Sequence, residues 1–283
     1  MTVFAVILLS PDSVLIRLVE EASPEVDSWT VLFWRGLLYA VGVSSLVFLK
    51  YRSTAINEFK SIGKGGLLIG LFSGISTGTF VFAIVYTSIA NTLVIISTGP
   101  IMIAIVSWFL LKEKSSLVTW ASMIIVFIGI YIVMSGSLGG ENLIGDFFAL
   151  ITAVMMGFTF TLTRKYKDVN MVPVNAIGGV IAALIAYVMA SKISVPPEVV
   201  KYIIAMGAIL SISFSLITIA PRYMPAAEVG MIMPLETVLG TLIAWYVINE
   251  EPSTNALIGG TIVIVTLFCH SWYSTKLARD QLT

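Results

Sequence analysis

The sequence predicts an all-α integral membrane protein with ten transmembrane helices, arranged as a 5+5 inverted repeat. Three observations lead to this prediction. Of the 283 residues, 58% are hydrophobic and only 11% are charged, and a water-soluble chain could not cover that much apolar side chain with a polar surface. The apolar residues fall into runs long enough to cross a bilayer, and two tracts in different halves of the chain resemble each other.

The apolar runs follow one another along the whole chain. A helix needs about 20 mostly apolar residues to cross the hydrocarbon core of a bilayer. The connections between the runs are short, so they leave no room for a second, water-soluble domain. The predicted spans are 2–19, 29–49, 65–86, 90–111, 117–135, 144–163, 172–190, 198–220, 226–248 and 254–273.

The basic residues are distributed unevenly between the two sides of these spans. With the N-terminus inside the cell, 12 of the 16 lysines and arginines fall in inside loops or the C-terminal tail. Only Lys192 and Lys201 fall outside, while Arg17 and Arg35 lie within spans. Because cytoplasmic loops retain basic residues, we expect a multi-pass protein of the cell (inner) membrane with both termini cytoplasmic.

Composition also limits the chemistry that this chain can perform. The net charge is zero, so there is no basic field for nucleic acid. Cys269 and His270 are the only cysteine and histidine, too few for a zinc, haem or iron–sulfur site. The sequence contains no HExxH, GxSxG or Walker A motif. We therefore expect no cofactor, no metal, no nucleic-acid partner and no enzymatic activity.

The two halves of the chain are related by a shift of 137 residues. Trp108 then falls on Trp245, Glu113 on Glu250, and Ser116 on Ser253. An odd number of helices per half makes the halves insert in opposite directions, which is the inverted-repeat architecture of secondary transporters. The predicted halves are residues 1–136 and 137–283; the alternative is chance similarity between apolar helices of like composition.

Three tracts carry a resemblance to a known family. They are FWRGLLYA (33–40), TSIANTLVIISTGPIMIAIVSWFLLKEKSS (87–116) and PAAEVGMIMPLETVLGTLIAWYVINEEPS (225–253). In these tracts the sequence resembles the drug/metabolite transporter superfamily, specifically its EamA-type members. The first half keeps the family's proline as Pro100, whereas the second half has Thr237 there and Pro234 one turn earlier.

The resemblance has implications for fold and function. It implies ten helices, an internal duplication, and export or exchange of small organic solutes such as amino acids. It also implies a central cavity built mainly from the first, third, fourth, sixth, eighth and ninth spans.

Charged residues inside spans are the first candidates for a site, because a charge at mid-membrane costs about 3 kcal/mol and must face protein or water. Glu236, near the middle of the ninth span, is a candidate for contact with a substrate amine or for proton coupling, or else the partner of a buried arginine. Arg35 is a candidate ligand of a substrate carboxylate or a member of a structural ion pair. Asp12, after Pro11, marks a helix break that lines the cavity or only satisfies freed backbone groups.

Other residues in the spans have both a functional and a structural interpretation. Ser97 and Thr98 are candidates for lining the cavity or for bonding to their own helix. Arg17 is expected to extend toward the outer surface, and Glu228 to cap a helix start. The glycines of the third span place a smooth face toward a neighbouring helix. They recur every four residues, as Gly66, Gly70, Gly74 and Gly78.

Together these observations predict a secondary transporter, an exporter or exchanger, that works by alternating access about hinges near Pro100 and Pro234. The expected partners are a small-molecule substrate and the lipid bilayer, and the expected state is a monomer or weak homodimer. The alternatives are a membrane-embedded enzyme, which needs a catalytic pair that the spans do not offer, and a scaffold without transport activity.

Overall fold

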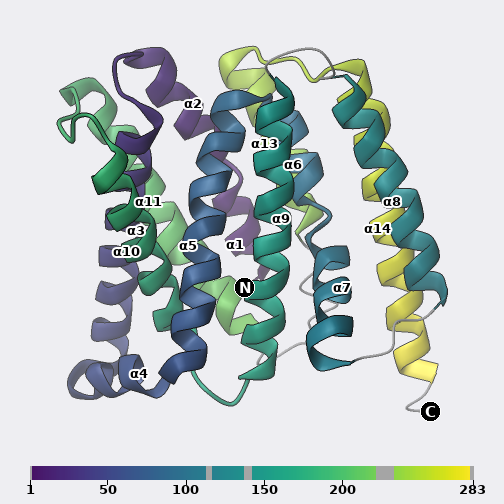
Figure 1. Ribbon diagram of the computed structural model, residues 1–283, viewed down its shortest axis with the longest axis horizontal. Helices are drawn as coiled ribbons and strands as arrows, with labels where there is room; N and C mark the ends of the chain where they lie inside the picture. The colour runs from purple at the N-terminus through teal and green to yellow at the C-terminus, as the bar shows by residue number, and fades with distance from the viewer. Residues whose placement is uncertain (1, 113–116, 137–141, 221–232, 281–283) are drawn as a thin grey trace.

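The computed structural model describes residues 2–112, 117–136, 142–220 and 233–280, and within these ranges it contains helices and no strand. The long helices run roughly side by side and form one bundle (Figure 1). In Figure 1, α2 ends at the top of the bundle, and we call this the upper end. The opposite end, where α4 lies, is the lower end. Both chain termini lie in the lower half of this view.

The first half of the chain forms eight α-helices and one short 3₁₀ helix, η1. They are α1 (Thr2–Leu9), α2 (Asp12–Ala22), α3 (Ser28–Tyr51), η1 (Arg52–Thr54), α4 (Ala55–Ser61), α5 (Gly63–Tyr86), α6 (Ile89–Ile96), α7 (Gly99–Leu111) and α8 (Leu117–Ser135). In the second half the described helices are α9 (Asn142–Lys165), α10 (Val172–Met189), α11 (Pro197–Ile219), α13 (Pro234–Ile248) and α14 (Thr254–Asp280).

Within the described ranges, seven helical stretches are long and apolar enough to cross a membrane, at the positions of the first four and the sixth to eighth predicted spans. Three shorter apolar helices, Trp120–Ser135, Leu235–Ile248 and Thr254–His270, lie at the positions of the fifth, ninth and tenth. The prediction of an all-helical membrane protein is confirmed in this coarse form. The exact 5+5 count stays a prediction, because these three helices are short.

Two predicted spans are broken rather than continuous. In the first span, α1 ends at Leu9 and α2 begins at Asp12, and the Ser10 hydroxyl donates to the carbonyl of Val6 at 2.8 Å. Pro11 has no N–H to continue the helix, so a new helix starts after it. In the fourth span the break falls just before Pro100, in the first turn of α7, where a missing N–H costs nothing.

Glycines allow the helices of the two halves to approach closely. α3 packs along α10, and a Cβ on Gly36 would lie only 2.7 Å from the carbonyl oxygen of Gly179. α8 packs along α14 at one edge of the bundle (Figure 1), and a Cβ on Gly129 would lie 3.0 Å from the Gly259 carbonyl oxygen. Both contacts are reciprocal, because a Cβ on the partner glycine would be equally crowded.

The upper half of the bundle is filled by one large apolar cluster. Its fully buried members include Ile16, Leu32, Ile84 and Ile89, which come from α2, α3, α5 and α6. Helices α10 and α11 contribute further buried members, so the cluster joins both halves of the chain.

Candidate functional site

A cavity of about 70 Å³ lies inside the bundle, between its middle and its lower end. A single water needs about 10–15 Å³ of such space, whereas pockets for drug-sized ligands reach about 300 Å³ or more. In this conformation the cavity therefore has room for only a few water molecules and is smaller than a pocket for a drug-sized ligand. It is lined by residues of α1, α2, α3, α5, α6, α9, α10, α11 and α13, so α3 and α10 join the helices that the family resemblance implies.

The upper part of the cavity holds a buried ion pair. Arg35 Nη2 lies 2.6 Å from Asp12 Oδ2, and the two side chains are 3% and 2% exposed. Asp12 opens α2, where the positive end of the helix dipole favours a carboxylate. The guanidinium carbon also lies 5.2 Å from the centre of the Phe80 ring. Arg35 is therefore a member of a buried ion pair and also lines the cavity, while its role as a ligand of a substrate carboxylate stays a prediction.

The ion pair keeps unused hydrogen-bonding capacity. Asp12 Oδ1 and the Nε and Nη1 atoms of Arg35 are buried and find no hydrogen-bond partner among the described residues. Buried polar groups are almost always hydrogen-bonded, and each unpaired one costs free energy. Since both residues line the cavity, water or a bound solute is the natural partner for these atoms.

Glu236 is the third charged residue of the cavity lining. It lies in the first turn of α13, and its backbone N–H donates to the carbonyl of Met233 at 2.9 Å. Its carboxylate is close enough to Asp12 and Arg35 to interact electrostatically with both. Three residues that are far apart in the sequence thus meet in one place, with two acidic groups and one basic group.

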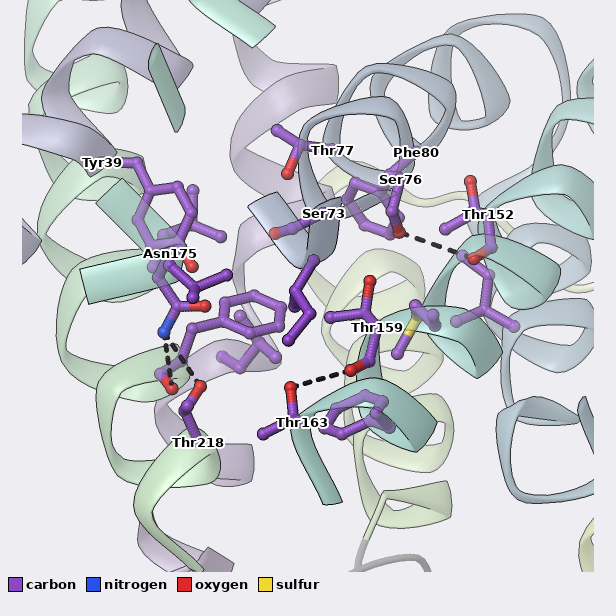
Figure 2. Close-up of a pocket in the computed structure, with 18 of the residues that line it drawn as sticks. Tyr39, Ser73, Ser76, Thr77, Phe80, Thr152, Thr159, Thr163, Asn175 and Thr218 are labelled. Carbon is purple, nitrogen blue, oxygen red and sulfur yellow. Dashed lines mark hydrogen bonds between the residues drawn. The ribbon is translucent and has the colours of Figure 1, made fainter. Parts of the chain in front are cut away.

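Hydroxyl and amide groups line the rest of the cavity, as Figure 2 shows. The Asn175 amide donates to Thr218 Oγ1 at 2.9 Å and to the Phe214 carbonyl at 3.3 Å, which links α10 to α11. On the opposite side, the Thr163 hydroxyl donates to the Thr159 carbonyl at 2.7 Å. The remaining polar lining residues are Tyr39, Ser73, Ser76, Thr77 and Thr152.

Some predicted site residues lie elsewhere. Ser97 and Thr98 are buried, and their hydroxyls donate at 2.7 Å to the carbonyls of Val94 and Ile95 in the same span. Neither residue lines the cavity; of this break only Ile96 does. Their hydroxyls instead satisfy carbonyls at the end of α6. Pro100 and Pro234 occupy the first turns of α7 and α13. Glu113 and Glu228 lie outside the described residues.

The four glycines of α5 do not share one neighbour. Gly70 and Gly74 face α10, where an added Cβ would lie 2.6 Å from Ile177 and 2.9 Å from the Gly178 carbonyl, respectively. A Cβ on Gly66 would instead meet Ile62 at the start of the same helix, and on Gly78 only Leu32 at 3.4 Å.

Above the apolar cluster, a polar network joins three helices at the upper end. Arg17 Nε lies 3.5 Å from Glu250 Oε2, and Arg17 Nη2 donates to the Thr87 carbonyl at 2.7 Å. Glu250 also accepts the backbone N–H of Ile89 at 2.5 Å, at the start of α6. Arg17 forms an additional ion pair with Glu20 at 3.0 Å. Arg17 was expected only to extend outward, but it binds the end of α13 instead.

The sequence interpretation missed several of these residues. Tyr39 and Asn175 give no signal, because one tyrosine or asparagine in an apolar span does not reveal which way it faces. Glu250 did give a signal, because it matches Glu113 in the other half. That match indicates a repeat but does not predict the ion pair with Arg17. Among the described residues, no group of three or more His, Cys, Asp or Glu side chains could hold a metal ion.

The sequence of this chain resembles known membrane transporters over most of its length. The sequence profile of the EamA-like transporter family matches residues 2–135 and 143–272. The chain belongs to the EamA-like transporter family. An uncharacterized transporter of Clostridium kluyveri is 24% identical to this EamA-like protein in an alignment over 262 residues that covers 86% of this chain and 84% of the relative.

Two further comparisons extend over most of this EamA-like chain. The uncharacterized transporter YoaV of Bacillus subtilis is 19% identical over 258 residues, covering 85% of this chain and 87% of the relative. A solved crystal structure with 16% identity has a TM-score of 0.71 and covers 98% of this chain and 96% of its own. At that identity it shows the shared fold alone.

Family membership and the apolar helices together give a coarse assignment. This EamA-like protein is a multi-pass membrane protein, and it groups with transporters of small molecules rather than with enzymes. The relatives are not characterized by substrate, so substrate and mechanism have to be argued from the cavity.

Proposed function

We propose that this protein is a secondary transporter of small polar metabolites such as amino acids, an exporter or exchanger that works by alternating access around the central cavity. The observation that carries the proposal is the meeting of Asp12, Arg35 and Glu236 on one cavity inside an apolar bundle. Charges at membrane depth are expensive to retain, and a structural ion pair needs only two of the three.

The cavity suits a solute that carries both an amine and a carboxylate. The free Nε and Nη1 donors of Arg35 offer hydrogen bonds to a carboxylate, and Glu236 offers a counter-charge for an ammonium group. Around them, hydroxyl side chains alternate with aromatic rings, including Phe80, Phe160 and Phe214. Such mixed walls bind a small organic side chain and its polar substituents together.

Alternating access is supported by the way equivalent helices pair. If residues 1–136 and 137–283 are related halves, α3 corresponds to α10 and α8 to α14, and each of these pairs packs against its own counterpart. α5 packs on α9 in the same way as α11 packs on α1 and α2. This pattern is what a two-fold relation between inverted halves produces, and it gives the bundle two equivalent arrangements to exchange between.

The broken spans supply joints for this exchange. We propose that α1 and α7 move about the breaks at Ser10–Pro11 and before Pro100, and that α13 moves about its start at Pro234. In the conformation described, the Arg17–Glu250 network closes the upper end while the cavity extends to the lower end. Opening of the upper end then requires loss of that network.

The direction of insertion follows from the basic residues. Lys50, Lys60, Lys64, Arg164 and Lys165 all lie at or near the lower ends of their helices. By the tendency of basic residues to remain inside the cell, we propose that the lower end faces the cytoplasm, in the cell (inner) membrane, with both termini on that side. The working unit is then a monomer or weak homodimer, because each chain contains a complete cavity.

The test is transport in proteoliposomes, with a panel of labelled amino acids and related metabolites. Glu236→Gln keeps the shape of the side chain and removes its charge, so we expect uptake of the best substrate to fall at least about tenfold, which corresponds to about 1.4 kcal/mol of lost interaction. Glu198→Gln, an exposed carboxylate at the start of α11, is the matched control and should transport normally. Normal transport by Glu236→Gln with an unchanged pH profile would remove Glu236 from the mechanism.

A further inference from the structure

A second hollow lies on the outside of the bundle, at its lower end and away from the central cavity. It is a groove of about 470 Å³ between the last turns of α3 and α11, with Val172 of α10 at its base. Apolar side chains form most of its walls, and Leu46, Leu49 and Ile212 are 37%, 76% and 40% exposed. Because these side chains face away from the bundle in a multi-pass membrane protein, lipid chains are what surround the groove.

One basic side chain stands at the lower end of the groove. Lys50 lies in the last turn of α3, and its ammonium group is 5.4 Å from the centre of the Tyr51 ring, which also lines the groove. No described carboxylate forms an ion pair with Lys50. A lysine at the end of a membrane helix carries its charge to the depth of the phospholipid headgroups.

A buried hydroxyl in the groove also lacks a partner. Ser215 is 7% exposed and lines the groove, yet its Oγ has no hydrogen-bond partner among the described residues. A serine in a helix ordinarily bonds to the carbonyl four residues earlier, and Ser211, one turn away, does so with Gly207 at 2.6 Å. Ser215 therefore keeps an unused hydrogen-bond donor in the wall of the groove.

We propose that this groove binds one membrane phospholipid with an anionic headgroup. Its phosphate lies at Lys50, an ester oxygen of its glycerol region accepts the Ser215 hydroxyl, and an acyl chain lies against Leu46 and Ile212. Ser215 lies about one helical turn above the end of α11, and Lys50 lies in the last turn of α3, so both are near the lower ends of the two walls. Free phosphate would satisfy Lys50 but would leave the apolar walls exposed, so the charge and the walls together favour a lipid.

The position of the groove gives the lipid a structural role. Its two walls, α3 and α11, belong to different halves of the chain, and their other faces carry Tyr39 and Phe214 of the central cavity. A bound lipid would hold these two helices together at the lower end. This inference depends only on the protein being embedded in a membrane and not on the proposed transport.

The test measures thermal unfolding of the purified full-length protein in detergent as lipid is added. The probes are phosphatidylglycerol, phosphatidylcholine with the same acyl chains, and soluble glycerol phosphate. We expect phosphatidylglycerol to raise the Tm at the lowest concentration, with the midpoint shifted about fivefold in Lys50→Gln, since one lysine near the headgroups contributes about that factor. Lys60→Gln, also exposed at the lower end but outside the groove, should behave as wild type.

The Ser215 hydroxyl is tested by a matched pair of variants. Ser215→Ala should weaken the response to both lipids, whereas Ser213→Ala should not, because Ser213 is also buried and also lacks a hydrogen-bond partner among the described residues but does not line the groove. The proposal is overturned if phosphatidylcholine acts as well as phosphatidylglycerol on the wild type, if Lys50→Gln keeps the full response, or if no lipid raises the Tm. It is also overturned if glycerol phosphate alone reproduces the effect, because the site would then bind a free anion.

Discussion

At the upper end of the bundle, hydrogen bonds tie neighbouring connections to one another, whereas the lower half contains a cavity lined by hydroxyl groups. The loop after α10 is held at the top of α3, since Ser191 donates to Asp27, Thr30 donates to the Lys192 carbonyl, and Trp34 donates to the Ile193 carbonyl at 2.7 Å. Close by, Arg17 joins Glu250 and Thr87.

Under the proposed alternating-access mechanism, this difference indicates which contacts have to change. A protein that opens alternately to two sides has to lose the bonds that seal one end while it closes the other. The upper end has many specific bonds that could be lost, and the lower half has space that could be closed. The predictions below test this division, beginning with the contact at the boundary between the two parts.

The largest effect is expected at the Asp12–Arg35 ion pair. Asp12→Leu leaves the guanidinium buried without its partner, and breaking a buried pair in this way costs about 3–5 kcal/mol. For a chain of this size we expect the Tm in detergent to fall by roughly 6–15 °C. Glu20→Gln, which removes an exposed carboxylate near Arg17, is the control and should change the Tm little.

The double variant separates loss of charge from loss of packing. With Asp12→Leu and Arg35→Leu together, no charge is left unpaired, so the double variant should be more stable than Asp12→Leu alone. If the loss of stability in the double variant equals the sum of the losses in Asp12→Leu and Arg35→Leu, the two side chains do not interact in the way that their 2.6 Å contact indicates.

The next effect is expected at the contact between α5 and α10, where glycines let the two helices pack closely. Gly74→Ala would place a Cβ 2.9 Å from the Gly178 carbonyl oxygen and 3.0 Å from Ile181. Overpacking of this kind typically costs about 1–3 kcal/mol, and we expect a lower Tm. Gly78→Ala in the same helix meets only Leu32 at 3.4 Å and should be neutral or slightly stabilising, since alanine favours helix. Equal losses for the two variants would contradict the close α5–α10 contact.

A smaller effect is expected from the Arg17–Glu250 network, which we propose closes the upper end of the bundle. Glu250→Gln removes the charge that Arg17 and the start of α6 share, a loss of about 1 kcal/mol for a partly exposed pair, or roughly fivefold in a conformational equilibrium. We expect a cysteine at Ser73, in a Cys269→Ser background, to react about fivefold faster with an impermeant thiol reagent applied from the upper side. Glu21→Gln, at an exposed position next to the network but outside it, should leave that rate unchanged. A fivefold increase from the lower side instead would reverse the assignment of the seal.

The smallest effect is a pH dependence at the upper rim. Partial burial alone would raise the pKa of Asp27, but hydrogen bonds from Thr30 and Ser191 outweigh it and hold the pKa below its ordinary value. A lowered pKa means that the bonded carboxylate stabilises the fold above the ordinary pKa and loses this contribution as the pH falls through the lowered value. Between pH 5 and pH 3 the Tm of Asp27→Asn should therefore fall less than that of wild type, and an identical fall in both would count against this role.

The sequence was sufficient to predict the membrane class, because apolar content and the length of apolar runs follow directly from the residue types and their order. It also predicted that Glu236, Arg35 and Asp12 matter, since a charge within an apolar run must face protein or water. It did not predict that α2, α3 and α13 bring these three to one cavity, because that depends on how helices rotate about their axes when they pack. Ser97 and Thr98 were misleading for a related reason: a hydroxyl near a helix break can bond to its own backbone, and the residue type does not distinguish the two uses.

The break between α1 and α2 has a mechanical consequence. α1 is only eight residues long, about 12 Å, and it joins α2 through Ser10 and Pro11 alone. Because α2 is anchored by Asp12 to Arg35 and by Arg17 to the top of the bundle, a swing of α1 can proceed by rotation about a few backbone bonds. In the proposed mechanism, the lower entrance then changes its width while the charged centre stays in place, and α1 and α2 divide gating and solute recognition between them.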